Sequence, residues 1–314
     1  FDTKFSADLT IMEEAHEFLD RVQNGGVLPL ITSCSPGWIK YCEHYFPDMT
    51  ENLSSCKSPQ QMFGAIAKSY YAEKMGLDPK DIVSVSIMPC TAKKFEIQRP
   101  DEAANGVPDV DYSLTTRELA RMIRKVGLKF NTLPDEEYDA PLGLGTGAAV
   151  IFGATGGVME AALRTAYHAL SGKNPDPDFF DDIRTVNEDY ALTEANLDFN
   201  GTTVRTAIVS GLGNTRKLLE AIRRGDVSYD FVEIMACPGG CVGGGGQPIC
   251  DGKELAGVRG ENLHFLDKNS KIRFSHENQD VAKLYQDFLE HPLSHKSHMI
   301  LHTDHNAWSM HDPE

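Results

Sequence analysis

The stretch MACPGGCVGGGGQP, residues 235–248, places two cysteines four positions apart among six glycines. A backbone this rich in glycine can approach another group closely, because no Cβ atoms stand in the way. Thiolates bind metals and clusters, and bare N–H groups can point at the sulfur atoms of a cluster. The fold must therefore bring Cys237 and Cys241 to a place where a bulky group is bound.

Strand ends are predicted to bring distant cysteines together. Three apolar runs are predicted to be β-strands that each end on a cysteine: 27–34, 81–90 and 229–237. Because the carboxyl ends of parallel strands converge on the ligand crevice of an open α/β sheet, their thiols are expected to meet. We therefore predict that Cys90, Cys237 and Cys241 bind a metal together. The thiols without such a context are expected to be small buried apolar side chains: Cys42, Cys56 and Cys250.

The cysteine count also bears on the metal and the compartment. Seven cysteines at uneven spacing do not form a secreted disulfide framework, and they favour metal ligands in a reducing, cytoplasmic setting. Structural zinc usually takes close cysteine pairs on small knuckles, whereas this chain has a single C-x3-C pair. The glycine loop suits a bulkier iron–sulfur cluster better. A formal charge of -16 argues against nucleic acid as a partner, and no apolar run approaches the length of a membrane span.

The order of predicted elements indicates an α/β fold. Residues 6–26 read as an amphipathic helix that starts near Ser6 or Asp8 and ends at Gly25. A strand, a glycine turn and a helix follow one another in 202–225, and the same order is predicted for 148–170, with its strand before the glycines. Alternation of this kind predicts mostly parallel sheets flanked by helices. The length of 314 residues suffices for two packed lobes.

Three long motifs, TSCSPGW at 32–38, MPCTAKKFE at 88–96 and EIMACPGGCVGGGGQP at 233–248, resemble the signatures of the catalytic domain of [FeFe]-hydrogenases. NLSSCKSPQQ at 52–61, FGATGGVMEAALR at 152–164 and SHKSHMILHT at 294–303 extend the resemblance, in the expected order. It covers nearly the whole chain. The chain is thus identified as similar to the large subunit of iron-only hydrogenases of the multisubunit NAD(P)-linked type.

The resemblance implies a two-lobed α/β domain with an H-cluster in the cleft between the lobes. In that cofactor a [4Fe–4S] cubane is joined through a cysteine sulfur to a di-iron unit carrying CO, cyanide and a bridging dithiolate. The implied activity is the reversible reduction of protons to H2. Within 1–314, the lobes are expected at roughly 1–130 and 131–260, with a C-terminal helical wrap at roughly 261–314.

The same resemblance implies partners. Members of the family usually carry upstream iron–sulfur domains, which take electrons from ferredoxin or from NAD(P)-oxidising subunits, and maturation proteins supply the cofactor. These domains are absent from this chain, and the first segment of the catalytic domain is expected to be missing too. The activity of this chain by itself is therefore left open.

The motif match also implies ligands. Cys90, Cys237 and Cys241 would bind the cubane, with Cys241 bridging to the di-iron unit. The Lys93 ammonium would pair with a cyanide, as a cation beside an anionic ligand should. The residues implied to wall the di-iron pocket are Met88, Met235, Pro59, Gln60 and Phe152.

The first motif departs from the family at one position. The family has two adjacent cysteines there, the first for proton transfer and the second as a cubane ligand, whereas this chain has Cys34 followed by Ser35. Ser35 therefore stands at the ligand position, although a serine alkoxide is harder and far more basic than a thiolate. We keep Cys34 as the proton carrier, and the alternative that Cys34 ligates the cubane stays open.

A proton path is implied by further matches. Glu14, Glu17 and Arg21 are spaced i, i+3 and i+7, so in a helix they lie along one face. Without the resemblance, a solvated salt-bridging stripe would be the better interpretation. With Ser54 and Cys34 at matching positions, the expected order from water inward is Arg21, Glu17, Ser54, Glu14, Cys34.

Other interpretations remain. A nicotinamide enzyme would suit the glycines in 143–157, but the strict G-x-G-x-x-G pattern is absent. Four histidines near the end, His295, His298, His302 and His305, are expected to have surface or packing roles. The main alternative is a relative that senses H2 or assembles iron–sulfur clusters without turnover. Retention of Cys34 and Lys93 favours the enzyme, and Ser35 argues slightly against it.

Overall fold

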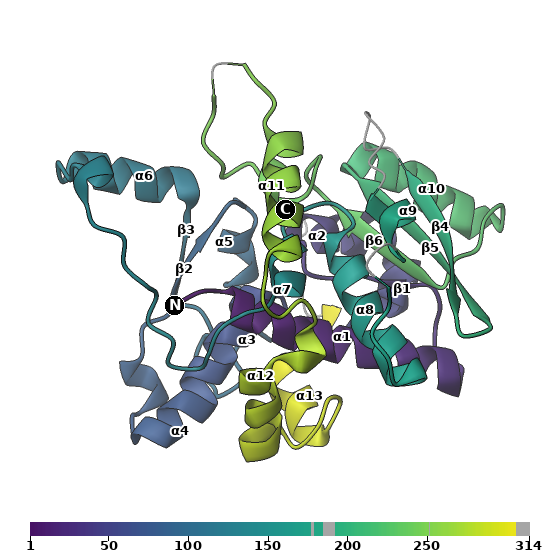
Figure 1. Cartoon of the computed structure of the whole chain (residues 1–314), viewed down its shortest axis with the longest axis horizontal. Coiled ribbons are helices and arrows are strands. Elements are labelled where there is room, and N and C mark those ends of the chain that lie inside the picture. The colour runs from purple at the N-terminus through teal and green to yellow at the C-terminus, as the bar shows by residue number, and fades with distance from the viewer. Residues whose placement is uncertain (177–178, 185–191, 251, 306–314) are drawn as a thin grey trace, which may run out of the picture.

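The computed structural model describes residues 1–176, 179–184, 192–250 and 252–305, and it shows two small sheets surrounded by helices (Figure 1). The larger sheet has the order β1-β6-β5-β4, with β4 antiparallel to β5 and the other neighbours parallel. The smaller sheet pairs β2 with β3 in parallel. The strands are β1 Leu30–Ile31, β2 Val85–Met88, β3 Tyr112–Thr115, β4 Thr193–Phe199, β5 Thr202–Ser210 and β6 Phe231–Met235. The predicted mixed α/β fold with mostly parallel sheets is confirmed.

Helices cover both sheets, and most are short. The α-helices of the described residues are α1 Lys4–Asn24, α2 Pro36–Tyr45, α3 Pro59–Ile66, α4 Ala72–Met75, α5 Lys93–Glu96, α6 Thr116–Lys125, α7 Gly147–Ile151, α8 Gly157–Ser171, α9 Asp181–Arg184, α10 Leu212–Arg224, α11 Ala256–Lys268, α12 Gln279–Leu284 and α13 His295–Leu301. Two π-helical turns, Ala67–Tyr71 and Tyr285–Leu289, follow α3 and α12. Single 3-10 turns are Pro47–Asn52, Pro79–Asp81, Phe130–Thr132, Cys241–Gly243 and Ser275–Glu277.

Helix α1 lies across the middle of the molecule beneath α7 and α8 (Figure 1). It ends as predicted, at Gly25, whose φ of 75° is the left-handed conformation that glycine adopts easily. It begins earlier than predicted, at Lys4, so Ser6 and Asp8 are buried inside the helix. Asp8 caps nothing in its own helix, because its carboxylate accepts hydrogen bonds from Thr146 instead, at 2.6 and 2.8 Å.

The strand predicted before the glycines of 148–170 is wrong, because α7 is helical there. A short apolar run does not reveal its own periodicity, and this one is buried in a cluster of Ile11, Ala148 and Ile151. A Cβ atom at Gly157 would lie 1.7 Å from the carbonyl oxygen of Ile151. Glycine is therefore required where α7 turns into α8.

The predicted strand over 81–90 is shorter than expected, and its apolar side chains face outward. Val83, Val85 and Ile87 are 65%, 50% and 46% exposed, respectively. Strand β2 nevertheless leads to Cys90 as predicted, because that residue follows two positions after its end. The smaller sheet, whose apolar side chains are partly exposed, thus leads to the candidate ligand Cys90.

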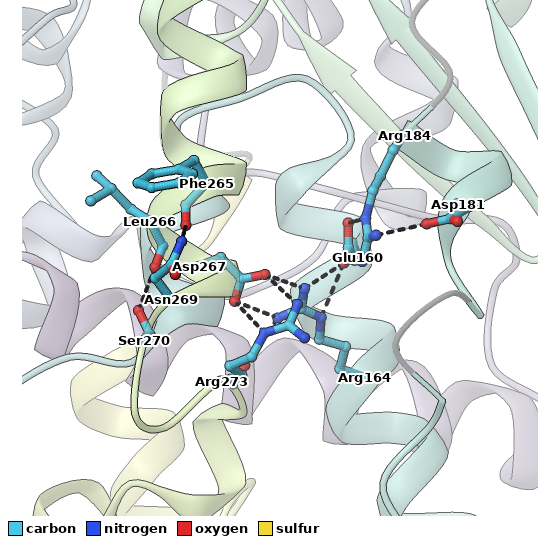
Figure 2. A network of polar contacts seen from close by, with 10 residues as sticks. All are labelled: Glu160, Arg164, Asp181, Arg184, Phe265, Leu266, Asp267, Asn269, Ser270 and Arg273. Carbon is cyan, nitrogen blue, oxygen red and sulfur yellow. Dashed lines mark hydrogen bonds and ion pairs between the residues drawn. The ribbon is translucent and has the colours of Figure 1, made fainter.

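A buried network of ion pairs fixes α8 against α11 and α9 (Figure 2). The Arg164 guanidinium lies 2.5 Å from a Glu160 oxygen and 2.7 Å from an Asp267 oxygen. Arg184 and Arg273 add one further cation to each carboxylate, at 2.6 Å in both cases. Burial alone would raise the pKa values of both carboxyl groups, but these guanidinium partners hold them below their ordinary values. The network positions the turn before α8, which packs against the cysteine loop.

Candidate metal centre

Cys90, Cys237 and Cys241 share one neighbourhood although β2 and β6 carry them from different sheets. Each is half-buried, without a disulfide. Burial, and then the charge of Cys90, raise the pKa of Cys241 to about 12. Burial likewise raises the pKa of Cys237, with Cys90 adding to it. Cys90 is thus close enough to both thiols for its charge to act on them.

Of the three cysteines predicted to be buried apolar side chains, two are buried and one is not. Cys42 and Cys56 are fully buried, as expected. Cys250 is half-exposed, so the prediction of a buried apolar side chain is wrong for it. It lies in an irregular segment after the glycine loop.

The glycines hold the cysteine loop against the MPC segment. A Cβ atom at Gly244 would lie 2.2 Å from the carbonyl oxygen of Pro89, and one at Gly246 would lie 2.8 Å from its carbonyl carbon. The Gly246 N–H donates a 2.8 Å hydrogen bond to the same oxygen. Glycine is therefore needed for backbone to pack on backbone, which brings Cys90 beside the loop. The N–H of Gly245 also hydrogen-bonds Cys237 and partly offsets the rise of its pKa.

The chemistry of the donor set suits an iron–sulfur cluster. A cubane is held by cysteine thiolates. Cys90, Cys237 and Cys241 supply such ligands, and the backbone N–H of Gly245 hydrogen-bonds the sulfur of Cys237, as donors around a cluster do. The residues present therefore fit that group.

Lys93 joins the first two cysteine motifs. Its ammonium donates to the carbonyl oxygen of Cys34 at 3.0 Å and to Glu96 at 2.9 and 3.0 Å. Burial alone would lower the pKa of Lys93, but the charges of Glu96 and then Cys90 raise it, so the group stays cationic. Sequence reasoning missed Glu96, for which the i, i+3 spacing from Lys93 on α5 was the available signal.

The predicted wall residues lie around this lysine and at the strand ends. Gln60 donates to Glu96 at 2.6 Å and, with Met88, lines a cavity of about 450 Å³. Pro59 is the first residue of α3, next to Gln60. Met235 is the buried last residue of β6, and Phe152 follows α7. Cys241 itself borders a separate cavity of about 370 Å³ together with Val242, Gln247 and Pro89.

In the first motif, Cys34 is half-buried and Ser35 precedes α2. Burial, and then the charges of Glu14 and Cys241, raise the pKa of Cys34 well above its ordinary value, while Lys93 opposes this. The charges of a carboxylate of α1 and of a candidate cubane ligand therefore both act on Cys34. Ser35 stands at the N-cap position of α2, yet its hydroxyl makes no capping hydrogen bond.

Four of the five predicted relay residues are linked by an ion pair or hydrogen bonds, and the charge of Glu14 acts on the fifth, Cys34. Arg21 contacts Glu17 at 2.6 Å, and the Ser54 hydroxyl lies 3.4 Å from Glu17. Ser54 also hydrogen-bonds Glu14, whose charge in turn acts on Cys34. Burial raises the pKa of Glu14 to about 8, and its Oε2 atom has no hydrogen-bond partner within the described part of the chain.

A polar group beside the relay was missed. Ser55 donates its backbone N–H to Glu17 at 3.1 and 3.2 Å, and its hydroxyl lies 2.7 Å from Nδ1 of His302. The other ring nitrogen of His302 lies 3.0 Å from Glu13. His302 and His305 are buried, whereas His295 and His298 are exposed. Glu13 stands directly before Glu14 in α1, so the sequence did contain a signal for it. The i, i+3, i+7 pattern of the relay residues does not include this position.

Comparisons with known proteins found matching family models and solved structures. The family model described as iron only hydrogenase large subunit, C-terminal domain, matches residues 1–245, and that of the iron hydrogenase small subunit matches residues 253–308. A solved structure of a variant of apo [FeFe]-hydrogenase HydA1 from Chlamydomonas reinhardtii superimposes with a TM-score of 0.84 at 42% identity, over 97% of this chain and 83% of that chain.

Curated relatives include hydrogenases and one other class. The NADP-reducing hydrogenase subunit HndD of Solidesulfovibrio fructosivorans is 49% identical over 96% of this chain and 52% of its own length. The periplasmic [Fe] hydrogenase large subunit of Nitratidesulfovibrio vulgaris is 49% identical over 80% of this chain and 60% of its own. A cytosolic Fe-S cluster assembly factor of Xenopus tropicalis is 33% identical over 98% of this chain and 66% of its own. The chain thus spans a little over half the length of the two hydrogenases.

Proposed function

This chain belongs to the family of iron-only hydrogenase large subunits, and from that premise we propose that it binds an H-cluster and reversibly reduces protons to H2. The observation that carries the proposal is the convergence of Cys90, Cys237 and Cys241 beside Lys93. When bound, the cofactor supplies the two-electron chemistry that makes or splits H2. The protein supplies ligands, orientation and protons.

The ligand roles follow the geometry. Cys90, Cys237 and Cys241 would hold the cubane, and Cys241, whose charge acts on Cys34, would bridge to the di-iron unit. Lys93 is buried and cationic, so it would pair with an anionic cyanide. The wall of the di-iron pocket would be formed by Met88, Met235, Pro59, Gln60 and Phe152. The site would lie in a cleft between lobes 1–130 and 131–260, with 261–314 wrapped around them.

Proton delivery would run inward from Arg21 and Glu17 through Ser54 and Glu14 to Cys34, and the contacts among the first four support this order. Glu14 has a pKa of about 8, so it holds its proton near neutral pH and can still release it. Cys34 would carry the proton over the last step, since a thiol is far more acidic than the hydroxyl of Ser54. Glu17, paired with Arg21, would take protons from outside.

Ser35 is proposed as the fourth cubane ligand or a close competitor for that position. Its hydroxyl is not used to cap α2, which leaves it available. Cys34 instead interacts with Glu14 and Cys241, which supports its assignment to the proton path rather than to the cubane.

Electrons would come from ferredoxin or NAD(P)-oxidising subunits through iron–sulfur domains, as the name of the NADP-reducing relative suggests. No described helix is long and apolar enough to cross a membrane. We propose a cytoplasmic location because the seven cysteines are unpaired, although one relative is named periplasmic.

A second candidate function is cluster assembly without H2 turnover. The 33% identical assembly factor and the Ser35 departure favour it. Against it stands the hydrogen bond that joins Lys93 to the backbone of Cys34, since a cation and a thiol at one place are what H2 chemistry requires.

Anaerobic reconstitution with iron and sulfide tests the proposal first. We expect an iron–sulfur absorption spectrum that is severely weakened in Cys237→Ala and retained in the control Cys250→Ser. Infrared bands of CO and cyanide should then appear in the full-length protein after cofactor maturation. Stoichiometric zinc without iron uptake would overturn the proposal, as would a loaded cubane that never yields these bands.

A further inference from the structure

Three buried side chains that can bind metal converge beside the relay. Glu17 comes from α1, Cys56 from the loop before α3, and His302 follows α13. One ligand atom of each lies within 4.8 Å of the other two, and all three residues are buried. The Cys56 sulfur is 3.6 Å from Oε2 of Glu17. Sulfur, imidazole nitrogen and carboxylate oxygen thus meet at one point, from three segments far apart in sequence.

Glu13 holds the ring of His302 in the orientation that is usual for a metal-binding histidine. A ligating histidine commonly donates its second ring N–H to a carboxylate, which fixes the tautomer. Here Nε2 of His302 lies 3.0 Å from Glu13. Burial alone would raise the pKa of Glu13, but its contacts with His302, Ser297 and Tyr285 lower it, so Glu13 accepts the proton of Nε2 as a carboxylate. The lone pair of Nδ1 is then directed toward Ser55 and Glu17.

The charge around the point favours a cation. Burial, and then the charges of Glu17, Glu14 and Glu13, raise the pKa of the Cys56 thiol. The same negative potential that retains this proton attracts a divalent ion. The guanidinium of Arg21 contacts Oε1 of Glu17 and leaves Oε2 on the side of Cys56.

We propose that Glu17, Cys56 and His302 bind a single zinc-class divalent cation. The ligands are Oε2, Sγ and Nδ1, and the hydroxyl of Ser55 or a water takes the fourth position. One thiolate, one imidazole and one carboxylate suit zinc, whereas magnesium and calcium prefer oxygen ligands alone. The thiol proton passes to solvent as the metal binds. This site is separate from the cubane cysteines.

Metal binding at this site would block proton transfer, an effect that rests on the proposed function. Glu17 is the outer carboxylate of the proton path, so a metal on its Oε2 occupies the atom that faces Ser54. A bound cation would also repel protons that enter beside Arg21. Zinc is therefore an inhibitor of H2 turnover that acts on proton entry and leaves the cofactor intact.

Zinc content after iron loading tests the site. The protein is reconstituted anaerobically with iron, its iron is counted, an excess of Zn²⁺ is added and loose metal is removed. We expect one zinc per chain, with a zinc X-ray absorption shell of one sulfur and three nitrogen or oxygen neighbours. Cys56→Ala and His302→Gln should weaken zinc affinity about 100-fold or more, and Glu13→Gln about tenfold. The control Cys250→Ser should bind zinc as the wild type does.

Two outcomes overturn the site: zinc content that is unchanged in both Cys56→Ala and His302→Gln, or a zinc shell of sulfur alone. The iron count reports separately on the proposed function. If no iron is taken up, zinc will also fill the cubane cysteines, yet wild type and Cys56→Ala should still differ by one zinc per chain.

Inhibition is measured on the matured full-length protein, with each variant compared to its own rate without zinc. We expect zinc to lower the wild-type rate at least tenfold, and the zinc concentration for half inhibition to rise at least tenfold in Cys56→Ala. The infrared bands of the cofactor should not move. Equal zinc sensitivity in both proteins would overturn the inhibitory role.

Discussion

Glu14 is a buried acid whose proton the fold retains. Its pKa rises from 4.5 to about 8, mainly through burial. Between these values the unfolded chain loses the proton and the folded chain keeps it, so the free energy of unfolding falls as pH rises. Glu14→Gln removes that dependence. We expect the variant to be more stable than the wild type at pH 8, on the order of a few kcal/mol, and about equal to it at pH 4.5.

Denaturant unfolding between pH 4.5 and 8.5 measures this difference. The exposed carboxylate of Glu73 on α4 provides the control, because Glu73→Gln should follow the wild-type curve. The buried acid Glu233, with a pKa of about 7, keeps part of the slope in every protein. Parallel curves for Glu14→Gln and wild type would contradict the assignment.

Cys34 gives the sharpest residue prediction for turnover. In the matured full-length protein, Cys34→Ala should lower H2 turnover about 100-fold or more and leave the infrared bands of the di-iron unit in place. Cys34→Asp should be milder, since a carboxylic acid can still carry a proton. Near-normal turnover in Cys34→Ala, or loss of the whole cubane signal, would show that Cys34 is not the proton carrier.

Ser35→Cys is the companion to this change. A thiolate in place of the hydroxyl should move the reduction potential or the paramagnetic spectrum of the cubane, because ligand type sets both. An unchanged spectrum and potential would place Ser35 away from the cluster and make Cys34 the next candidate ligand.

At the scale of residues, the sequence predicts which candidate ligands meet. It predicts less well which side chains hold the site residues in place. Cys90, Cys237 and Cys241 follow strand ends, and strand ends converge by a general rule. Glu96 is marked only by its i, i+3 spacing from Lys93, and its contacts with Ser58 and Gln60 come from distant parts of the chain. Ser55 contacts Glu17 and His302 across the fold, and no pattern in the chain marks it.

The glycine loop packs closely against the segment that carries Cys90. Gly244→Ala should place a Cβ atom 2.2 Å from the Pro89 carbonyl oxygen, so the loop must move away from Cys90. We expect reconstituted Gly244→Ala to hold less than half of the wild-type iron. Gly245→Ala is the matched control, since its Cβ would meet only the Thr91 side chain, at 3.7 Å.

Iron content and absorption of the two variants measure the outcome. Equal iron loading of both would show that the loop tolerates a shift and that glycine at 244 is not required for the site. Iron lost from Gly245→Ala as well would point instead to the local backbone around Cys237.

Long elements with a clear period are predicted well, and short ones are not. Helix α1 and the pair β5 and α10 lie where the patterns place them. The apolar run that forms α7 is too short to show a period, and only its packing between α1 and α11 makes it helical. The start of α1 differs because Asp8 caps another segment of the fold rather than its own helix.

On the scale of the whole molecule, the buried ion-pair network couples distant parts of the chain (Figure 2). Arg164→Ala should lower the free energy of unfolding by about 3–5 kcal/mol, because it leaves Glu160 and Asp267 buried with one cation fewer. Arg216→Ala, which breaks an exposed pair with Glu220, should change it hardly at all, because solvent screens the pair. Denaturant unfolding of both variants checks the contrast, and similar losses would contradict it.

The overall architecture is only partly readable from the chain. Alternating strands and helices predict mostly parallel sheets, which the fold has. They do not predict that β1, two residues long and within 1–130, pairs with β6 some 200 residues later. Such pairing depends on tertiary packing, because register over so short a strand carries almost no pattern.

The two-stranded sheet has a consequence in time as well as in space. Two strands with exposed apolar side chains are held by few neighbours, so they open more often than the four-stranded sheet does. Backbone amides of β2 should therefore exchange their hydrogens with solvent sooner than those of β6. Because β2 ends just before Cys90, a cluster that assembles in place would gain this ligand last. A bound cluster would then hold the end of β2 in place and slow the opening of this two-stranded sheet.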